Sequence, residues 1–270
     1  FDGPGGLSRL FGAKAGKPGR AVEVRPGLFL AVAQGEAALG EYLELVIPIR
    51  RLLEVVFSSE LYRHFVAAAP GLKELMAVGK VWYEFQRVGA DGLPQWNAVV
   101  VDAGASGHSL QYLAMPKAAA AAFASGFVHR ESVRVAALLQ DPNKTAVHVV
   151  TTAEEMPTAE ATEIISQLRG RLGLPLGRLY VNRCLGAPPA GAAEAVDLLA
   201  QAPVRGARSS LVDSLRRALA LWEAQEKAVC ELESRTGIKA VRLPFLASEK
   251  FGPAQLKALV PYLGEEGQGG

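Results

Sequence analysis

The chain alternates short apolar runs with longer segments whose apolar residues recur at helical spacing. The short runs are rich in Val, Leu and Ile and predict strands over residues 23–30, 97–102, 146–152, 178–182 and 239–243. The longer segments predict helices over residues 37–57, 71–86, 117–140, 158–172, 209–236 and 253–263. Strands that alternate with helices are typical of a parallel sheet. The sequence therefore predicts an α/β fold, a layered parallel sheet flanked by helices.

The predicted elements fit one domain. A chain of 270 residues suits one large α/β domain or two small ones, and we predict a single domain over residues 1–263, followed by a disordered tail over 264–270. Proline and glycine interrupt the pattern at residues 186–191 and 201–208, which predicts surface loops there.

Composition and charge exclude several classes of protein. Half of the residues are apolar and 21% are charged, a balance that a disordered chain does not have. The formal net charge is only +2, so we expect no nucleic-acid partner. No apolar run reaches the roughly 18–20 residues of a membrane span, and no leader pattern occurs at the start, which predicts a cytoplasmic location.

The strongest chemical signal begins at the end of the predicted strand 97–102. This strand places Asp102 at its carboxyl end, and small residues follow it, among them Gly104, Ser106 and Gly107. Open α/β sheets bind ligands at that edge, where an aspartate can hold Mg²⁺ directly or through water beside nucleotide phosphates. The alternative is an aspartate that only caps the following turn or helix.

Residues 102–113 resemble a known ATPase segment. They are similar to the Walker-B and switch II segment, D-T-A-P-T-G-H-T-L, of the arsenite-pump and tail-anchored-protein-targeting (anion-transporting) ATPases, a deviant-Walker branch of the P-loop NTPases. Asp102, Gly107 and His108 are shared, serine replaces threonine at Ser106, and residues 103–105 depart from T-A-P. The resemblance implies a P-loop NTPase-like fold with helices over the nucleotide edge. It also implies that Asp102 binds Mg²⁺, while Ser106, Gly107 and His108 line the nucleotide.

The opening of the chain resembles switch I of the same family. Residues 2–11 are similar to D-P-A-H-S-L-S-D-A-F, which implies that Asp2 orients or deprotonates the attacking water. Without this register, Asp2 is a solvated terminal residue. Residues 70–75 are similar to the family's P-G-x-x-E element, although a Pro-Gly turn before a helix explains them equally well.

Two later segments resemble the base site of the family. Residues 179–183 are similar to the V-V-N-x strand end, which implies that the Asn182 amide reads the adenine edge through its donor and acceptor. The alternative is an asparagine that ends a strand in a turn. Residues 241–252 are similar to the P-L-x-x-E-x-x-G loop, which implies that Pro244, Phe245 and Leu246 cover the base.

The sequence contains no phosphate-binding loop of the G-x-x-x-x-G-K-[ST] type or of its deviant K-G-G-x-G-K-[ST] form. In the family, this loop and its strand precede switch I. A strand removed from inside a sheet leaves buried backbone groups unsatisfied at about 1–3 kcal/mol each, against a domain stability of about 5–15 kcal/mol. We therefore expect an N-terminal unit that is missing from this sequence, and we expect the present chain alone not to hydrolyse ATP.

The resemblance implies an ATP-binding and ATP-hydrolysing switch protein that uses ATP and Mg²⁺. Such proteins act as homodimers or as heterodimers with a paralogue, and they couple hydrolysis to conformational change and to client or partner handling. Arsenite is not the expected substrate, because Cys184 and Cys230 are the only thiols and lie far apart in the sequence. The zinc clasp of the eukaryotic members is also missing from residues 187–208.

Several alternatives stay open. Leu, Val and Phe on the predicted helices could bind a hydrophobic client helix or a membrane-protein partner, although apolar helix faces normally pack on the sheet. A non-catalytic paralogue or scaffold partner of such an ATPase has the same fold. An unrelated α/β binding protein is the third alternative, and it does not bring Asp2, Asp102 and Asn182 together.

Overall fold

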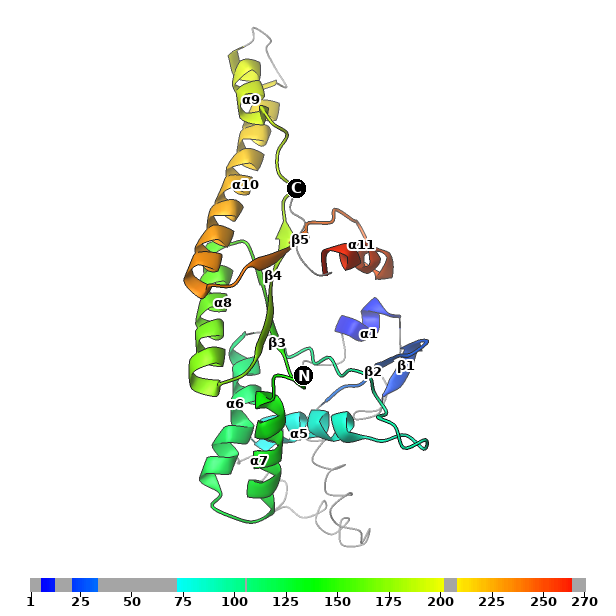
Figure 1. The fold of residues 1–270 in the computed structure, drawn as a ribbon. Coiled ribbons are helices and arrows are strands. Elements are labelled where there is room, and N and C mark those ends of the chain that lie inside the picture. Colours follow the sequence, from blue (N-terminus) through cyan, green and yellow to red (C-terminus); the bar gives the residue numbers. More distant parts are fainter. Residues whose placement is uncertain (1–5, 13–20, 34–71, 105, 202–207, 264–270) are drawn as a thin grey trace, which may run out of the picture. The chain divides into compact units, whose positions relative to one another are not determined.

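The computed structural model describes residues 6–12, 21–33, 72–104, 106–201 and 208–263 (Figure 1). These residues fall into two compact units. The first unit comprises Phe1–Ala146 with Leu172–Pro175, and the second comprises Val147–Arg171 with Leu176–Gly270. The predicted helix over 37–57 and the predicted tail over 264–270 lie outside the described residues, and the prediction of a single domain stays a prediction.

The second unit is built on a three-stranded parallel sheet of order β3-β4-β5, which confirms the α/β class. Its elements are β3 (Val147–Thr152), α8 (Glu155–Gln167), the π-helical turn Leu168–Leu172, β4 (Leu176–Cys184), α9 (Ala192–Gln201), α10 (Arg208–Thr236), β5 (Ala240–Pro244) and α11 (Pro253–Leu263). The predicted strands over 146–152, 178–182 and 239–243 are confirmed. Helices α8 and α10 lie on one side of the sheet and α11 lies on the other (Figure 1).

The core of this unit lies between the sheet and the helices α8 and α10. Leu179 and Val181 of β4 are almost completely buried, as are Val229 and Leu232 of α10 and Ile165 of α8. Buried β-branched and leucine side chains of this kind supply most of the free energy that favours folding. The middle strand of the sheet therefore contributes its centre to the core of the unit.

Helices α9 and α10 form a hairpin in the same unit. Each contributes one buried valine, Val196 and Val212, and Arg216 of α10 forms an ion pair with Asp197 of α9 at 3.1 Å. The sequence analysis predicted α10 but not α9, because residues 192–201 lie between two stretches predicted as loops. The first of these, 186–191, has no helix or strand, as predicted.

The first unit contains a two-stranded hairpin and several helices. Its elements are α1 (Gly6–Leu10), β1 (Val22–Arg25), β2 (Leu28–Leu30), α5 (Leu72–Gln86), α6 (Ser106–Ala122) and α7 (Phe127–Gln140). Helix α5 confirms the prediction over 71–86. It buries Leu75, Ala77 and Val78, and it contacts α6 and α7.

Two predictions in this unit are wrong in the same way, because a turn was missed. Residues 23–30 form the antiparallel hairpin β1–β2 instead of one strand. Pro26 and Gly27 occupy its turn, where Gly27 has a φ of 75°, a conformation that glycine adopts without strain. The single helix predicted over 117–140 is divided into α6 and α7, because the chain turns at residues 123–126 and Gly126 has a φ of 94°.

Candidate functional site

The carboxyl ends of β3, β4 and β5 meet at one edge of the parallel sheet. In the register of these strands, Thr152 lies beside Asn182, and Cys184 lies beside Pro244. The amide N–H of Phe245 donates to the carbonyl oxygen of Cys184 at 2.8 Å, which continues the pairing past the end of β5. This edge is where open α/β sheets bind ligands. The structure thus brings together the two segments that the sequence predicted as the base site.

Asn182 and Arg183 lie in β4, in the irregular stretch between Val181 and Cys184 where the register with β5 shifts. The Asn182 side-chain oxygen accepts a hydrogen bond from the Arg183 amide at 2.9 Å. A side-chain carbonyl oxygen has two lone pairs, so this bond leaves one for a ligand. Arg183 has a φ of 62°, and among the described residues it is the one non-glycine residue with a positive φ. That conformation costs a residue with a Cβ roughly 1–2 kcal/mol, so its neighbours must hold it in place.

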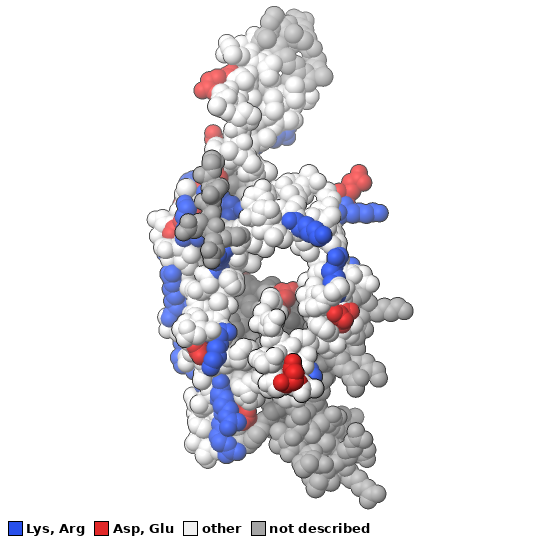
Figure 2. Space-filling view, turned by 45° about the vertical axis from the view of Figure 1, so that its right-hand side comes forward, with Lys and Arg blue, Asp and Glu red and all other residues white. Residues whose placement is uncertain are grey.

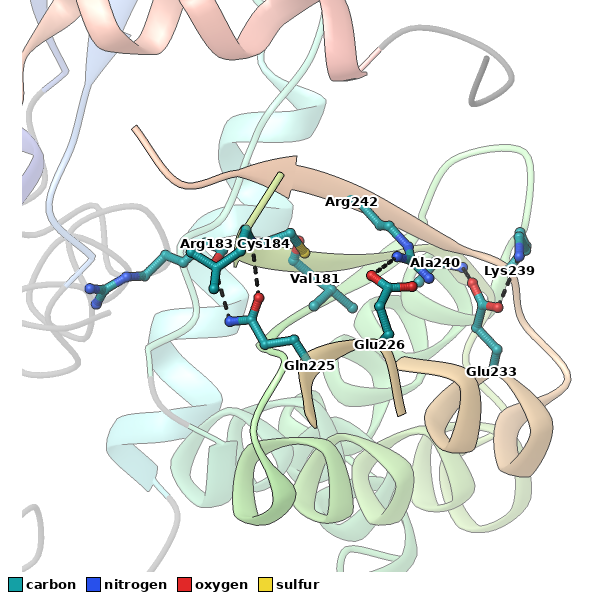
Figure 3. A network of polar contacts seen from close by, with 10 residues as sticks. Val181, Arg183, Cys184, Gln225, Glu226, Glu233, Lys239, Ala240 and Arg242 are labelled. Atoms are coloured by element: carbon teal, nitrogen blue, oxygen red, sulfur yellow. Dashed lines mark hydrogen bonds and ion pairs between the residues drawn. The ribbon is translucent and has the colours of Figure 1, made fainter. Parts of the chain in front are cut away.

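Gln225 of α10 binds the backbone on both sides of Cys184 (Figure 3). Its side-chain oxygen accepts from the Leu185 amide at 2.9 Å, and its side-chain nitrogen donates to the Arg183 carbonyl at 3.5 Å. An amide side chain can imitate the donor and acceptor of a neighbouring strand in this way. Helix α10 is therefore bound directly to the end of the strand that carries Asn182 and Arg183.

Arg183 also reaches across to the loop after β5. Its guanidinium carbon lies 5.4 Å from the centroid of the Phe245 ring, within the range of a cation–π contact. The Phe245 side chain is about half exposed, at 47%. The edge of the sheet thus presents a planar cation and an aromatic ring, next to the Asn182 amide.

A second set of contacts fixes β5 to α10 (Figure 3). Arg242 forms an ion pair with Glu226, and Glu233 accepts from the Ala240 amide and from Lys239, each at 2.9 Å. The hydrogen bond that Arg242 donates to Glu226 raises the pKa of Arg242. Burial acts to raise the pKa of Glu233, but the bonds from Ala240 and Lys239 outweigh it and hold the pKa below its ordinary value. The strand that leads to Phe245 is thereby anchored by charged groups.

The two cysteines of the chain lie in different surroundings. Cys184 is half-buried at the end of β4, its thiol donates to the Val181 carbonyl at 3.3 Å, and burial raises the pKa of this thiol. Cys230 is exposed on α10. Within the described ranges, no group of three or more His, Cys, Asp or Glu side chains is placed to hold a metal ion.

The segment that carries Asp102 differs from its prediction. Residues 97–102 form no strand, so the prediction over 97–102 is wrong. Val99, Val100 and Val101 are 37%, 94% and 40% exposed, and Asp102 is exposed as well. A strand needs hydrogen-bonded neighbours, and in the part of the chain that the structure describes no strand pairs with this segment.

The remaining predicted residues are placed as follows. Ser106, Gly107 and His108 lie in the first turn of α6, directly after the Asp102 segment. A Cβ added to Gly107 would meet nothing within 4 Å, so packing inside this structure does not require glycine there. Asp2 lies outside the described residues. Asp102 to His108 belong to the first unit, whereas Asn182 and Pro244 to Leu246 belong to the second. Their convergence on one cleft stays a prediction.

The sequence analysis did not assign roles to Arg183, Gln225 and Glu226. Arg183 stands directly after the predicted asparagine, and a residue that follows a strand end is a signal that could have found it. Gln225 and Glu226 lie inside a long helix with mixed charges, and only the packing of α10 on the sheet shows what they contact.

Comparison with known proteins gives partial matches. The chain is 34% identical over 155 residues to the protein named ATPase BagA from Mycobacterium tuberculosis. It is equally similar to "Putative ATPase Mb3704" from Mycobacterium bovis. Each match covers 55% of this chain and 43% of the relative, so the chain spans less than half the length of the curated relatives it matches. No family model matches the chain.

Among the helices in the described ranges, none is both long enough and apolar enough to cross a bilayer.

Proposed function

We propose that this chain is part of an ATP-binding and ATP-hydrolysing switch protein of the arsenite-pump and tail-anchored-protein-targeting type. The observation that carries the proposal is the edge of the β3-β4-β5 sheet. There Asn182 and the loop from Pro244 to Leu246 lie on neighbouring parallel strands, joined by the bond from the Phe245 amide to Cys184. The likeness to proteins named ATPase supports the same activity.

At this edge, Asn182 would read the base, and Pro244, Phe245 and Leu246 would cover it. An amide offers a donor and an acceptor in one plane, as the Watson–Crick edge of adenine does, and Phe245 is exposed enough to accept a ring against its face. The base would lie beside a rigid strand, since Gln225 and the Glu226–Arg242 pair anchor both loops to α10.

The phosphates would lie beside Asp102 and the start of α6. In the proposed reaction, a water attacks the γ-phosphorus, the bond to the oxygen that bridges to the β-phosphate breaks, and ADP and phosphate leave. Mg²⁺ would neutralise charge on the phosphate oxygens, with Asp102 on its side, and Asp2 would orient the water. Ser106, Gly107 and His108 would contact the γ-phosphate and move when it is lost.

The phosphate-binding loop itself is not in this sequence, so under this proposal it belongs to another part of the protein. The exposed valines before Asp102 support that arrangement, because a β-branched run that lies open to solvent is suited to pair with a further strand. A non-catalytic partner of such an ATPase, which has the same fold, is the second candidate, and turnover by the full-length protein separates the two.

We further propose partner handling, as a homodimer, as a heterodimer with a paralogue, or with a hydrophobic client. The α9–α10 hairpin supports this, since Leu198 and Leu211 are 68% and 53% exposed. In the view of Figure 2, the described surface of the α9–α10 hairpin at the top of the picture carries few charged side chains. Exposed apolar groups that lie together often mark an interaction surface.

The test is ATP turnover by the full-length protein, compared with its Asp102→Ala variant. We expect turnover to fall at least a hundredfold in the variant. Without the Asp102 carboxylate, Mg²⁺ would be held less firmly beside the phosphates, and weaker neutralisation of the phosphate charge raises the barrier by several kcal/mol. The Asp91→Ala variant is the matched control, since Asp91 is an exposed aspartate of a surface turn in the same unit. Equal turnover in the Asp102 variant and the wild type would remove Asp102 from the mechanism. Binding of ATP without turnover in the wild type would favour the non-catalytic partner.

A further inference from the structure

The backbone of Arg183 is held in a left-handed conformation at the end of β4. We propose that Arg183 is a base-contact residue, whose guanidinium stacks on one face of a purine ring while the Phe245 ring takes the other face. This inference rests on the proposed nucleotide binding and adds a residue to it that determines affinity for the base.

The backbone of Arg183 is strained. A φ of 62° is unfavourable for arginine, and glycine or asparagine would adopt it more readily. The conformation is nevertheless stabilised from three directions, by the Asn182 side chain, by Gln225, and by the bond between Phe245 and Cys184. Strained residues that their surroundings hold so firmly are concentrated at binding and active sites.

The Arg183 side chain points toward the loop that follows β5. Arg183 reaches the loop of the neighbouring strand, where its guanidinium lies over Phe245 at 5.4 Å. In Figure 3, the Arg183 side chain points away from the Gln225 and Glu226 contacts of α10. Arg183 is exposed and forms no ion pair within the described residues. Arg242, by contrast, is paired with Glu226.

Arg183 and Phe245 both offer flat faces on which a ring can stack. A guanidinium is planar, weakly hydrated and stacks on aromatic faces, which an ammonium group cannot do. At 5.4 Å the two groups are in direct contact, so an entering ring must separate them. The ring then gains stacking on Phe245 and a cation–π contact with Arg183, which together exceed the one exposed contact that is lost.

Asn182 directly precedes Arg183 in β4. The Asn182 side-chain oxygen lies 2.9 Å from the Arg183 backbone nitrogen, and under this proposal a base between Arg183 and Phe245 would present its edge to the Asn182 amide. The pair supplies affinity for any planar ring, and Asn182 supplies the choice of hydrogen-bonding edge. The ligand class is therefore a purine nucleotide, recognised by the face and the edge of its base.

The experiment measures the affinity of the full-length protein for ATP and for inorganic tripolyphosphate, which has no base, by isothermal titration calorimetry. We expect Arg183→Ala to weaken ATP binding about tenfold and to leave tripolyphosphate binding unchanged. Arg183→Lys keeps the charge but loses the plane, and we expect most of the same loss. Arg217→Ala removes an exposed arginine of α10 and is the matched control, with no change for either ligand.

Arg183→Gly separates the side chain from the backbone strain. Glycine relieves the strain, so this variant should be at least as stable as Arg183→Ala and should show the same tenfold loss of ATP affinity. ATP affinity at the wild-type level in both variants would overturn the role of Arg183 and leave the proposed function standing. An equal loss for ATP and tripolyphosphate would also overturn it, because Arg183 would then act on phosphates. A folded wild-type protein that binds neither ligand would contradict the proposed function itself.

Discussion

Two runs of this chain have opposite environments, although both contain valine and both were predicted as strands. Val181 lies in the middle strand β4 and is 0% exposed, whereas Val100 lies in the segment before Asp102 and is 94% exposed. Strand β4 has a hydrogen-bonded strand on each side, and within the described residues the 97–102 segment has none. A run with strand propensity thus becomes a strand only where neighbours supply hydrogen-bond partners and burial.

The comparison also bears on function. The edge at Asn182 and Phe245 is anchored to α10 by Gln225 and by the pair between Arg242 and Glu226. Within the described residues, the Asp102 segment belongs to no paired strand. In the proposed ATPase, the base would bind where the backbone is already anchored, after the Arg183 side chain moves off the Phe245 ring, and the phosphate side would gain its structure when the nucleotide binds.

The same substitution at the two valines should separate the two regions most clearly. Val181→Ala removes two buried methyl groups from the centre of the sheet and should lower the free energy of unfolding by about 2–3 kcal/mol. Val100→Ala removes two solvated ones and should change it by less than about 0.5 kcal/mol. Urea denaturation followed by circular dichroism measures both. Equal destabilisation by the two substitutions would mean that Val100 is buried in the protein and would break the comparison.

A smaller effect is expected where the anchoring of β5 depends on a charge. Glu233→Gln weakens the bonds to the Ala240 amide and to Lys239, and should cost about 1–2 kcal/mol of stability at pH 7. The folded-state pKa of Glu233 is lowered, so its stabilisation is complete above the ordinary value of 4.5 and is lost as pH falls through the folded-state value. The difference between wild type and variant should therefore shrink below pH 4.5.

Glu231→Gln is the matched control for this effect. Glu231 lies on the same helix, and its pairing with Lys227 at 3.9 Å is largely exposed, so the substitution should change stability by less than about 0.5 kcal/mol at any pH. A difference between wild type and the Glu233 variant that stays constant from pH 7 to pH 3 would show that the carboxylate charge does not anchor β5.

Part of the fold could be predicted from the sequence because local pattern and tertiary environment agree there. The three paired strands are short apolar runs buried by helices, and α11 begins at a proline, the residue best suited to a first helical position. The failures have local causes. The turns at Gly27 and Gly126 depend on single glycines with positive φ, and the 97–102 run depends on neighbours that its own residues do not encode.

The candidate site shows the same limit. Asn182 and the loop from Pro244 to Leu246 were predicted from the resemblance of residues 179–183 and 241–252 to the ATPase segments, and the structure places both at the carboxyl edge of the sheet, while their role stays a prediction. Gln225 and Glu226 could not be predicted, since 40 residues separate Gln225 from Leu185, and the helix pattern does not show which side chains face the loop. The conformation of Arg183 was equally hidden, because propensity argues against it.

The most direct test of the proposed base site is photolabelling of the full-length protein with 8-azido-ATP, followed by peptide mapping. The reactive group is on the purine ring, so the label reports the position of the base and not that of the phosphates. We predict labelling within residues 182–185 or 244–246, abolished by excess ATP. Labelling that ATP abolishes but that lies elsewhere in the chain, with none at this edge, would contradict the account.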